Sequence, residues 1–353
     1  MAESTQADQQ QSMKPHEMHA ITGRRKALLI GINYTGTSAA LRGCVNDVKR
    51  IKGFLTNKGF PDTPETMLVL TDDGNNDPNK KPTKANMLAG LKWLLTNVAA
   101  GDSLFLHYSG HGGRVADTNG DEDDGFDETI IPLDYESAGQ IVDDDLHKIV
   151  CEPLPKGARL TVIFDSCHSG TALDLPFIFD NNNLLPAQEV KPDAPAKKGS
   201  PIGGILKKIS SVIKGKGGKG ALGTAANLGS TLLNLAGDYI EKNGVPINGF
   251  FPQGATANEV KTGGTQAVKP VEYGDVIMFS GCKDAQTSMD VSSNGTAGGA
   301  MSTTFLEVMT KNNGTVSYLT LLSQIRDVMK GKFEQIVQMS TSYTIDMQQN
   351  FAI

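Results

Sequence analysis

Short apolar runs alternate with amphipathic segments along most of this chain. Runs of strand length occur at residues 26–34, 67–70, 104–108, 129–133, 160–164 and 275–282, and a last strand is expected near 339–343. Uninterrupted runs of this kind are typical of strands buried on both faces of a sheet. Apolar residues at helical spacing predict helices over 46–58, 83–98, 302–309 and 318–329. Alternating strands and helices predict an α/β fold with an open, mostly parallel sheet and helices on both faces.

Two stretches interrupt this pattern. Residues 1–23 are polar and Gln-rich, which is typical of a disordered arm. Residues 181–270 are rich in Asn, Pro, Gly, Ala and Lys, and so long a connection in a compact fold is either functional or disordered. We therefore expect four parts: the disordered arm (1–23), a large segment (24–180), a flexible basic linker (181–270) and a small segment (271–353) that completes the same sheet.

Composition and charge narrow the class of protein. The 353 residues are 39% hydrophobic and carry a net charge of −6, which gives no reason to expect nucleic-acid or membrane binding. No apolar run is long enough to span a bilayer, and the N-terminus has no signal-peptide pattern. The four cysteines are widely spaced without a C-x-x-C pair, which favours reduced thiols. We expect a cytoplasmic protein.

Reactive side chains follow two of the predicted strands. Residues 160–164 lead into Asp165-Ser166-Cys167-His168-Ser169-Gly170, and residues 104–108 lead into Ser109-Gly110-His111-Gly112. Ligands of open α/β sheets lie at the carboxyl ends of the strands. A thiolate is a nucleophile, and a nearby imidazole lowers the thiol pKa and later protonates the leaving amine. We interpret Cys167 and His111 as a catalytic dyad, with the backbone amides of Gly112 and Cys167 as oxyanion donors.

These residues have alternative interpretations. A single Cys–His pair in a sequence is more often a buried cysteine and an unrelated surface histidine, but here both residues follow strands and lie beside glycines, which favours catalysis. Ser166 or Ser169 as a nucleophile is disfavoured because neither lies in a G-x-S-x-G turn.

Several motifs together resemble one family. Tyr108-Ser109-Gly110-His111-Gly112 followed by Asp165-Ser166-Cys167-His168-Ser169-Gly170 is similar to the caspase-like cysteine peptidases, with the histidine roughly 50 residues upstream of the cysteine. The caspase signature Gln-Ala-Cys-x-Gly is absent, and Asp-Ser-Cys-His-Ser-Gly instead resembles the metacaspases with a type I-like catalytic core. Further matches are residues 41–47, 174–176 and 279–288. The resemblance covers about residues 26–180 and 271–353, and it implies a caspase-like fold and a cysteine endopeptidase.

The resemblance also implies a pocket for a basic side chain. Metacaspases cleave after Arg or Lys, and their pocket positions match Asp47, Asp165 and Ser109. Two carboxylates lining one pocket would select a cation through charge-assisted hydrogen bonds. The alternative is that Asp47 caps the following helix and that Asp165 binds only backbone groups.

Calcium is the implied cofactor. Residues 117–128 form the densest acidic cluster, and Asp143-Asp144-Asp145 offers further oxygen ligands. An EF-hand is rejected because position 6 of such a loop would be Glu122 and strands are expected on either side. The four calcium-binding aspartates of related metacaspases match Asp127, Asp143, Asp144 and Asp174. We expect calcium to order loops around the pocket, and the bland alternative is a solvated acidic loop.

The basic linker offers cleavage sites to an enzyme of this specificity. Its exposed candidates for self-cleavage are Lys207, Lys208, Lys214, Lys216 and Lys219. The whole sequence therefore predicts a monomeric, calcium-dependent cysteine endopeptidase that cleaves protein substrates after Arg or Lys and processes itself in the linker. The alternative is a calcium-regulated scaffold or aggregate-handling protein on the same fold, with little proteolysis.

Overall fold

The computed structural model describes residues 15–74, 77–116, 126–166, 172–179, 271–282, 298–330 and 336–353. All of these belong to one compact unit. Cys167, the linker lysines and residues 117–125 of the acidic loop lie outside the described residues.

A seven-stranded sheet is the centre of this unit. Its order is β2-β1-β3-β7-β9-β10-β8, and the first five of these strands run parallel while β10 is antiparallel to both of its neighbours. The strands span β1 (Arg25–Gly31), β2 (Met67–Thr71), β3 (Ser103–Ser109), β7 (Arg159–Asp165), β8 (Phe177–Phe179), β9 (Asp275–Cys282) and β10 (Ile336–Thr341). The sheet is open and mostly parallel, as the apolar runs predicted.

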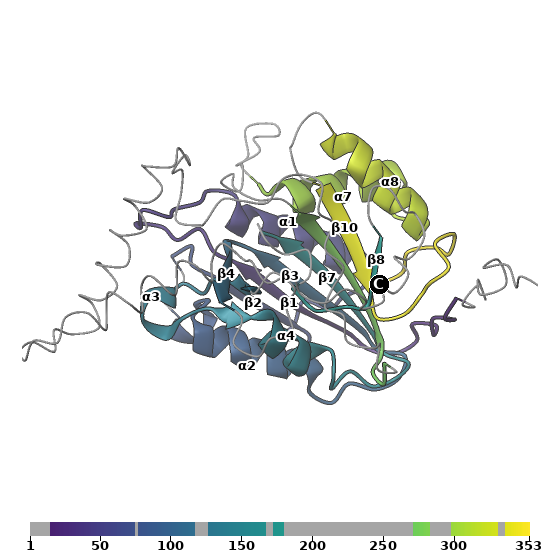
Figure 1. The fold of residues 1–353 in the computed structure, drawn as a ribbon, viewed down its shortest axis with the longest axis horizontal. Helices are drawn as coiled ribbons and strands as arrows, with labels where there is room; N and C mark the ends of the chain where they lie inside the picture. The colour runs from purple at the N-terminus through teal and green to yellow at the C-terminus, as the bar shows by residue number, and fades with distance from the viewer. Residues whose placement is uncertain are drawn as a thin grey trace, which may run out of the picture. The chain divides into compact units, whose positions relative to one another are not determined.

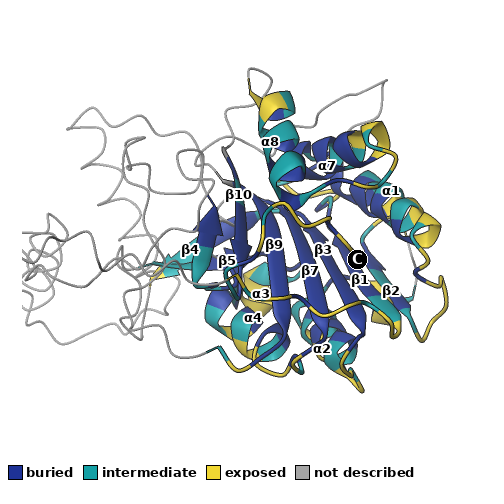
Figure 2. Ribbon diagram, turned by 90° about the vertical axis from the view of Figure 1, so that its right-hand side faces the viewer, coloured by how far each residue is buried: buried dark blue, intermediate teal, exposed yellow. Residues whose placement is uncertain are grey.

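Helices cover both faces of the sheet. Figure 1 shows α1 (Cys44–Asn57), α7 (Ala300–Lys311) and α8 (Tyr318–Met329) on one side, and α2 (Lys84–Leu95) and α4 (Asp143–Val150) on the other. Side chains alternate along β1, so that Leu28 packs in the core beneath α2 and Leu29 packs in the core beneath α1. The Thr83 side chain caps α2 by accepting a hydrogen bond from the Asn86 amide. Figure 2 shows the strands as the most uniformly buried elements.

A second, three-stranded antiparallel sheet extends from the end of β3. It consists of β4 (Gly112–Ala116), β5 (Phe126–Ile130) and β6 (Ile141–Val142), with α3 (Tyr135–Ala138) between the last two strands. A short 3-10 helix, η2, spans Pro78–Lys80. The sequence pattern predicted β5 only approximately, as 129–133, and it did not predict β4, β6 or α4.

The N-terminal stretch differs from the expected disordered arm. Residues 15–22 lie along the folded unit: the His16 amide donates to the Thr344 carbonyl, and the Met18 side chain is buried. Met18 is a lone apolar residue in a polar stretch, so its burial in the core beneath α8 left no periodic signal. In the part of the chain that the structure describes, no helix combines the length and apolarity needed to cross a bilayer.

Candidate active site

Strands β1, β3 and β7 end side by side. Ser109 at the end of β3 is in register with Gly31 of β1 and with Asp165 of β7. The Gly110 amide continues the ladder by donating to the Asp165 carbonyl (3.4 Å). His111 therefore lies two residues beyond the end of β3, and in the sequence Cys167 comes two residues after Asp165, the last residue of β7. Cys167 itself is outside the described residues.

Two buried tyrosines hold the backbone of His111. The His111 amide donates to the Tyr34 hydroxyl (3.1 Å), and the Tyr108 hydroxyl donates to the His111 carbonyl (2.6 Å). Tyr34 in turn donates to the Ile131 carbonyl (2.6 Å), and its ring lies 4.7 Å from the imidazole. Gly110 is needed beside them, because a Cβ there would lie 2.6 Å from the Tyr108 hydroxyl oxygen. The sequence did not predict a role for either tyrosine, since their partners are backbone groups, which any residue type supplies.

The His111 ring is fixed in one tautomer. Its Nε2 lies 2.7 Å from the carbonyl oxygen of Ala39, which can only accept a hydrogen bond. Nε2 therefore carries the proton, and Nδ1 of the neutral ring has a free lone pair. Burial lowers the pKa of His111, while the hydrogen bond to Ala39 opposes this shift. A neutral imidazole with an unprotonated Nδ1 is suited to accept a proton from a thiol.

Replacing Tyr34 with Phe is expected to misplace this imidazole. The substitution leaves the buried His111 N–H without its partner, while the Ile131 carbonyl keeps a longer hydrogen bond from Tyr108 (3.3 Å); the loss costs about 1–3 kcal/mol of stability. We expect kcat against a peptide substrate to fall about 10-fold with little change in KM, because orientation of a catalytic group affects the chemical step. Steady-state kinetics and urea unfolding measure the two effects. Tyr318→Phe is the control: Tyr318 is buried in the other core, so kcat should not change.

Asp47 and Ser109 meet at the same edge of the sheet. Asp47 lies in the first turn of α1 and is completely buried. The Ser109 hydroxyl and the Gly299 amide each donate to Asp47 Oδ2 at 2.8 Å, and Arg50 forms an ion pair with the other oxygen. Burial and the charge of Asp165 raise the pKa of Asp47 to about 7.

Asp165 is bound by the beginning of α7. Its carboxylate accepts hydrogen bonds from the amides of Ser302 (2.7 Å) and Met301 (3.4 Å), which are first-turn donors without intrahelical partners. Burial raises the pKa of Asp165, and these hydrogen bonds oppose the shift. Asp47 and Asp165 thus form a pair of buried, electrostatically coupled carboxylates. The predicted pocket residues Asp47, Asp165 and Ser109 lie together, and the capping alternative for Asp47 is not observed because its carboxylate points toward Gly299 and Ser109.

The aspartates expected to bind calcium gather around α4. Asp143 is buried at the start of the helix and accepts a hydrogen bond from the Glu128 amide (2.7 Å). Burial, together with the charges of Glu128 and Asp127, raises the pKa of Asp143 to about 7. Asp144 forms an ion pair with Lys148 on the exposed side of the same helix. Asp174 lies close enough to Cys151, the residue after α4, for its charge to help raise the pKa of the Cys151 thiol, which burial already raises. The backbone of Asp174 has a positive φ of 46°.

This arrangement is not a closed metal site. Within the described residues, one group of three potential ligand side chains has its donor atoms within 4.8 Å of one another, and that group contains none of these aspartates. Gly112 is the first residue of β4 and directly follows His111. The role of its backbone amide as an oxyanion donor stays a prediction. Cys44, the first residue of α1, is a buried free cysteine.

Comparison with known proteins first defines the fold. The crystal structure of protein GSU0716 from Geobacter sulfurreducens matches with a TM-score of 0.51 and 22% identity, covering 93% of this chain and 97% of that chain. At this identity the likeness shows the fold alone. The mixed, mostly parallel sheet with helices on both faces is the caspase-like α/β fold.

The family follows from the sequence. Residues 25–176 match the model for "Metacaspase, peptidase C14 domain". Metacaspase-1 of Mycosarcoma maydis is 43% identical over 96% of this chain and 75% of its own length. Metacaspase-1 of Cryptococcus neoformans is 43% identical over 95% of this chain and 66% of its own length, and that of Emericella nidulans is 44% identical over 92% and 72%. The chain belongs to the metacaspase family, whose members are cysteine-type endopeptidases.

Proposed function

We propose that this chain is a calcium-dependent cysteine endopeptidase that cleaves after Arg or Lys. One observation supports this specificity above others: two buried carboxylates and Ser109 lie at the strand edge that also carries His111. A substrate guanidinium or ammonium group would find two acceptors there. An aspartate side chain would meet like charge, so the caspase preference is disfavoured.

The residues imply the following reaction. The Cys167 thiol transfers its proton to Nδ1 of His111, and the thiolate attacks the scissile carbonyl carbon. The amides of Gly112 and Cys167 donate to the oxyanion that forms. His111 then gives the proton to the leaving amine, which leaves an acyl-enzyme. A water molecule that loses a proton to His111 hydrolyses the thioester and restores the free thiol.

The acid pair already has an internal cationic partner. The Arg50 guanidinium pairs with Asp47 and also donates to the Thr303 hydroxyl (2.8 Å) on α7. About a third of the Arg50 side chain is exposed, so it shields the carboxylate only from one side. The pKa of Asp47 is raised to about 7 despite Arg50, because burial and the charge of Asp165 outweigh the guanidinium. A substrate-derived cation would stabilise the ionised form of both carboxylates, and this favours a basic side chain in the pocket.

The candidate calcium residues fit a hard cation in their chemistry. They supply carboxylate oxygens, which calcium prefers and tolerates in irregular arrangements. Asp143 is buried close enough to Asp127 and Glu128 for their charges to raise its pKa, and a divalent cation would relieve this repulsion. Asp127, Asp143 and Asp144 would hold the ion, with Asp174 from the neighbouring loop. Calcium would order the loops beside the acid pair, and proton transfer would remain with His111.

A single assay tests the main proposal. Purified protein is incubated with fluorogenic peptides ending in Arg, Lys or Asp, with calcium or with chelator, alongside Cys167→Ala. We expect calcium-dependent cleavage after Arg and Lys, and none by the alanine variant. Cleavage after Asp, or equal rates in chelator, would contradict the proposal. Calcium binding with no cleavage of any peptide would favour the scaffold alternative.

Asp143→Asn tests the calcium residues separately from catalysis. The folded-state pKa of about 7 exceeds the ordinary value of 3.8, so folding takes up a proton between these values. Without calcium, the free energy of unfolding of the wild type therefore falls as pH rises through this window. We expect the variant to lose the part of this pH dependence that Asp143 contributes, and to be the more stable protein at pH 8. Calcium should raise Tm of the wild type by several degrees and leave the variant unchanged.

The control for this measurement is Asp62→Asn. Asp62 is about half exposed and pairs with Lys52, and it should retain both the calcium response and the pH dependence. An undiminished calcium response in Asp143→Asn would remove Asp143 from the site.

Self-processing in the linker is the remaining part of the proposal. Lys207, Lys208, Lys214, Lys216 and Lys219 are its candidate sites. Mass spectrometry of fragments formed in calcium should locate the cut, and the fragments should be absent for Cys167→Ala. Fragments that persist in the alanine variant would come from a contaminating protease.

A further inference from the structure

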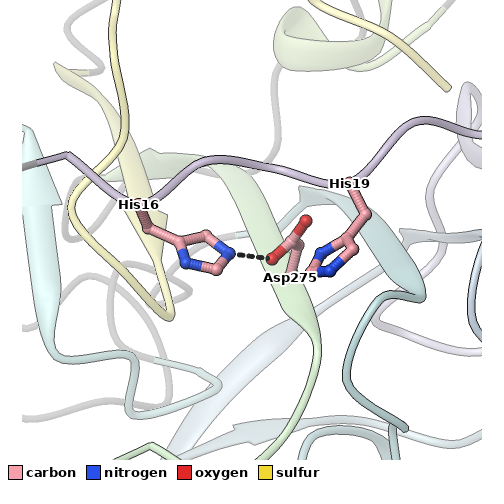
Figure 3. A group of neighbouring side chains, drawn as sticks. All are labelled: His16, His19 and Asp275. Carbon is pink, nitrogen blue, oxygen red and sulfur yellow. Dashed lines mark hydrogen bonds and ion pairs between the residues drawn. The ribbon is translucent and has the colours of Figure 1, made fainter.

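Two histidines and a buried aspartate converge at the amino-terminal edge of the sheet. His16, His19 and Asp275 each place a potential ligand atom within 4.8 Å of the others (Figure 3). His16 and His19 come from the stretch that precedes β1, and Asp275 is the first residue of β9. In register with Asp275 is Arg159, the first residue of β7, whereas the candidate active site lies at the other end, beyond Asp165. At about 3.3 Å per residue the two ends are roughly 20 Å apart.

The surroundings hold two of these groups in place. His16 Nε2 lies 2.8 Å from Asp275 Oδ1, the Tyr343 ring stacks on the imidazole at 4.3 Å, and the His16 amide is bonded to Thr344. Arg159 donates to the His19 carbonyl (2.9 Å) and lies 3.6 Å from Asp275 Oδ2. The Arg159 guanidinium therefore contacts both the Asp275 carboxylate and the His19 backbone. Residues that position metal ligands in this way, without binding the ion themselves, are typical of metal sites.

Asp275 is the observation that points to a ligand. Its residue is only 4% exposed, and within the described part of the chain its Oδ2 makes no hydrogen bond. The carboxylate therefore carries a buried negative charge that is matched by one guanidinium at long range and one imidazole. Figure 3 shows the His19 ring beside the same carboxylate, on the side opposite to His16.

We propose that His16, His19 and Asp275 bind a divalent transition-metal ion of the zinc type. Zinc–nitrogen and zinc–oxygen distances of about 2.0–2.2 Å place tetrahedral ligands about 3.3–3.5 Å apart. The distance of 2.8 Å between His16 Nε2 and Asp275 Oδ1 is already near this value. The ring nitrogen of the exposed His19 lies within 4.8 Å of the other two ligand atoms, so it needs to move by about 1 Å to reach the tetrahedral separation. Two imidazoles disfavour calcium and magnesium, which prefer all-oxygen sites. Water would complete the coordination.

Such an ion would link two parts of the chain that are distant in sequence, the stretch before β1 and strand β9, which follows residues 181–270. Arg159 connects the site to a third part, β7, and to the Ala352 carbonyl. The expected consequence is higher stability, with no direct role in peptide cleavage. The inference is independent of the proposed calcium dependence, because no aspartate of that set takes part.

The test uses full-length Cys167→Ala, which removes the catalytic thiol as a competing zinc ligand. Isothermal titration with Zn²⁺ should show one site per chain. The His19→Gln substitution, at an exposed position, should lower the affinity for Zn²⁺ at least 10-fold without loss of folding. Saturating Zn²⁺ should raise Tm by about 5 °C in the parent and much less in the variant. Co²⁺ should give visible ligand-field bands without a thiolate charge-transfer band.

His147→Gln is the matched control. His147 lies on α4, bonds the Leu173 carbonyl and packs edge-on against Tyr273, and it is not one of the three proposed ligands, so its variant should bind zinc as the parent does. Identical zinc affinity in the parent and His19→Gln would overturn the proposal. So would no Tm response to zinc, or a thiolate band with cobalt. The trio would then be a hydrogen-bonded contact that holds residues 15–22 and nothing more.

Discussion

Asp47→Asn should reduce kcat/KM for Arg and Lys peptides about 100-fold, mainly through KM, because a charge-assisted hydrogen bond to substrate becomes a neutral one. Asn is nearly isosteric, and it can still accept hydrogen bonds from Ser109 and Gly299. The wild-type pKa near 7 adds a pH signature. In the wild type, kcat/KM should rise as pH increases through 7, since Asp47 then becomes an anion. This limb should be missing from the variant.

The same substitution should stabilise the protein above neutral pH. The folded-state pKa of Asp47 exceeds its ordinary value of 3.8, so the wild type loses stability as pH rises from about 4 through 7. At pH 8 we expect the free energy of unfolding of Asp47→Asn to be about 1–2 kcal/mol higher, allowing for the lost ion pair with Arg50. Asp62→Asn serves as the surface control and should change neither quantity. A less stable and fully active Asp47→Asn variant would mean that the carboxylate is structural.

The sequence predicted the elements whose signal is local. β9 and α8 were predicted at their observed bounds, because an apolar run and an amphipathic period each specify one element. α4 was missed: its first turn is Asp143-Asp144-Asp145, a sequence that also fits a solvated loop, although acids at a helix N-terminus are favourable. β8 has only three residues and β6 only two, which is too short for periodicity to be detected. β4 has five residues, but it begins with two glycines and contains an arginine, so it has no apolar run.

The residues of the candidate site show the same difference between local signals, which the sequence carries, and long-range contacts, which it does not. His111, Asp165 and Ser109 could be placed at one edge of the sheet because each follows or ends a buried strand, and parallel strands bring their carboxyl ends together. The pocket role of Ser109 and the position of Asp47 beside it depended on a family resemblance. The contacts that hold these groups join residues far apart in sequence, such as Asp47 with Gly299, Asp165 with Ser302, and His111 with Ala39. No single-sequence pattern records such pairs, since each partner is a backbone amide or carbonyl that any residue type supplies.

Gly299→Ala should be the most damaging single methyl group near this site. Gly299 precedes α7 with φ −72° and ψ 151°, a conformation that alanine adopts without strain. The reason for glycine is space: a Cβ would lie 2.2–2.6 Å from the three carboxyl atoms of Asp165. Because Asp165 is held by the amides of Met301 and Ser302, moving it breaks buried charge-assisted hydrogen bonds. We expect a loss of about 3 kcal/mol in stability, and kcat/KM for Arg peptides should fall at least as far as in Asp47→Asn.

Gly53→Ala is the control that separates crowding from the general cost of changing a glycine. Gly53 is an exposed residue inside α1, and a Cβ there meets no atom within 4 Å. Alanine should raise the free energy of unfolding by about 0.5–1 kcal/mol, because glycine is unfavourable in a helix interior. Urea unfolding and peptide kinetics on both variants give the comparison. If Gly299→Ala matched Gly53→Ala in both measurements, α7 could shift away from Asp165, and the acid pair would not depend on this close backbone approach.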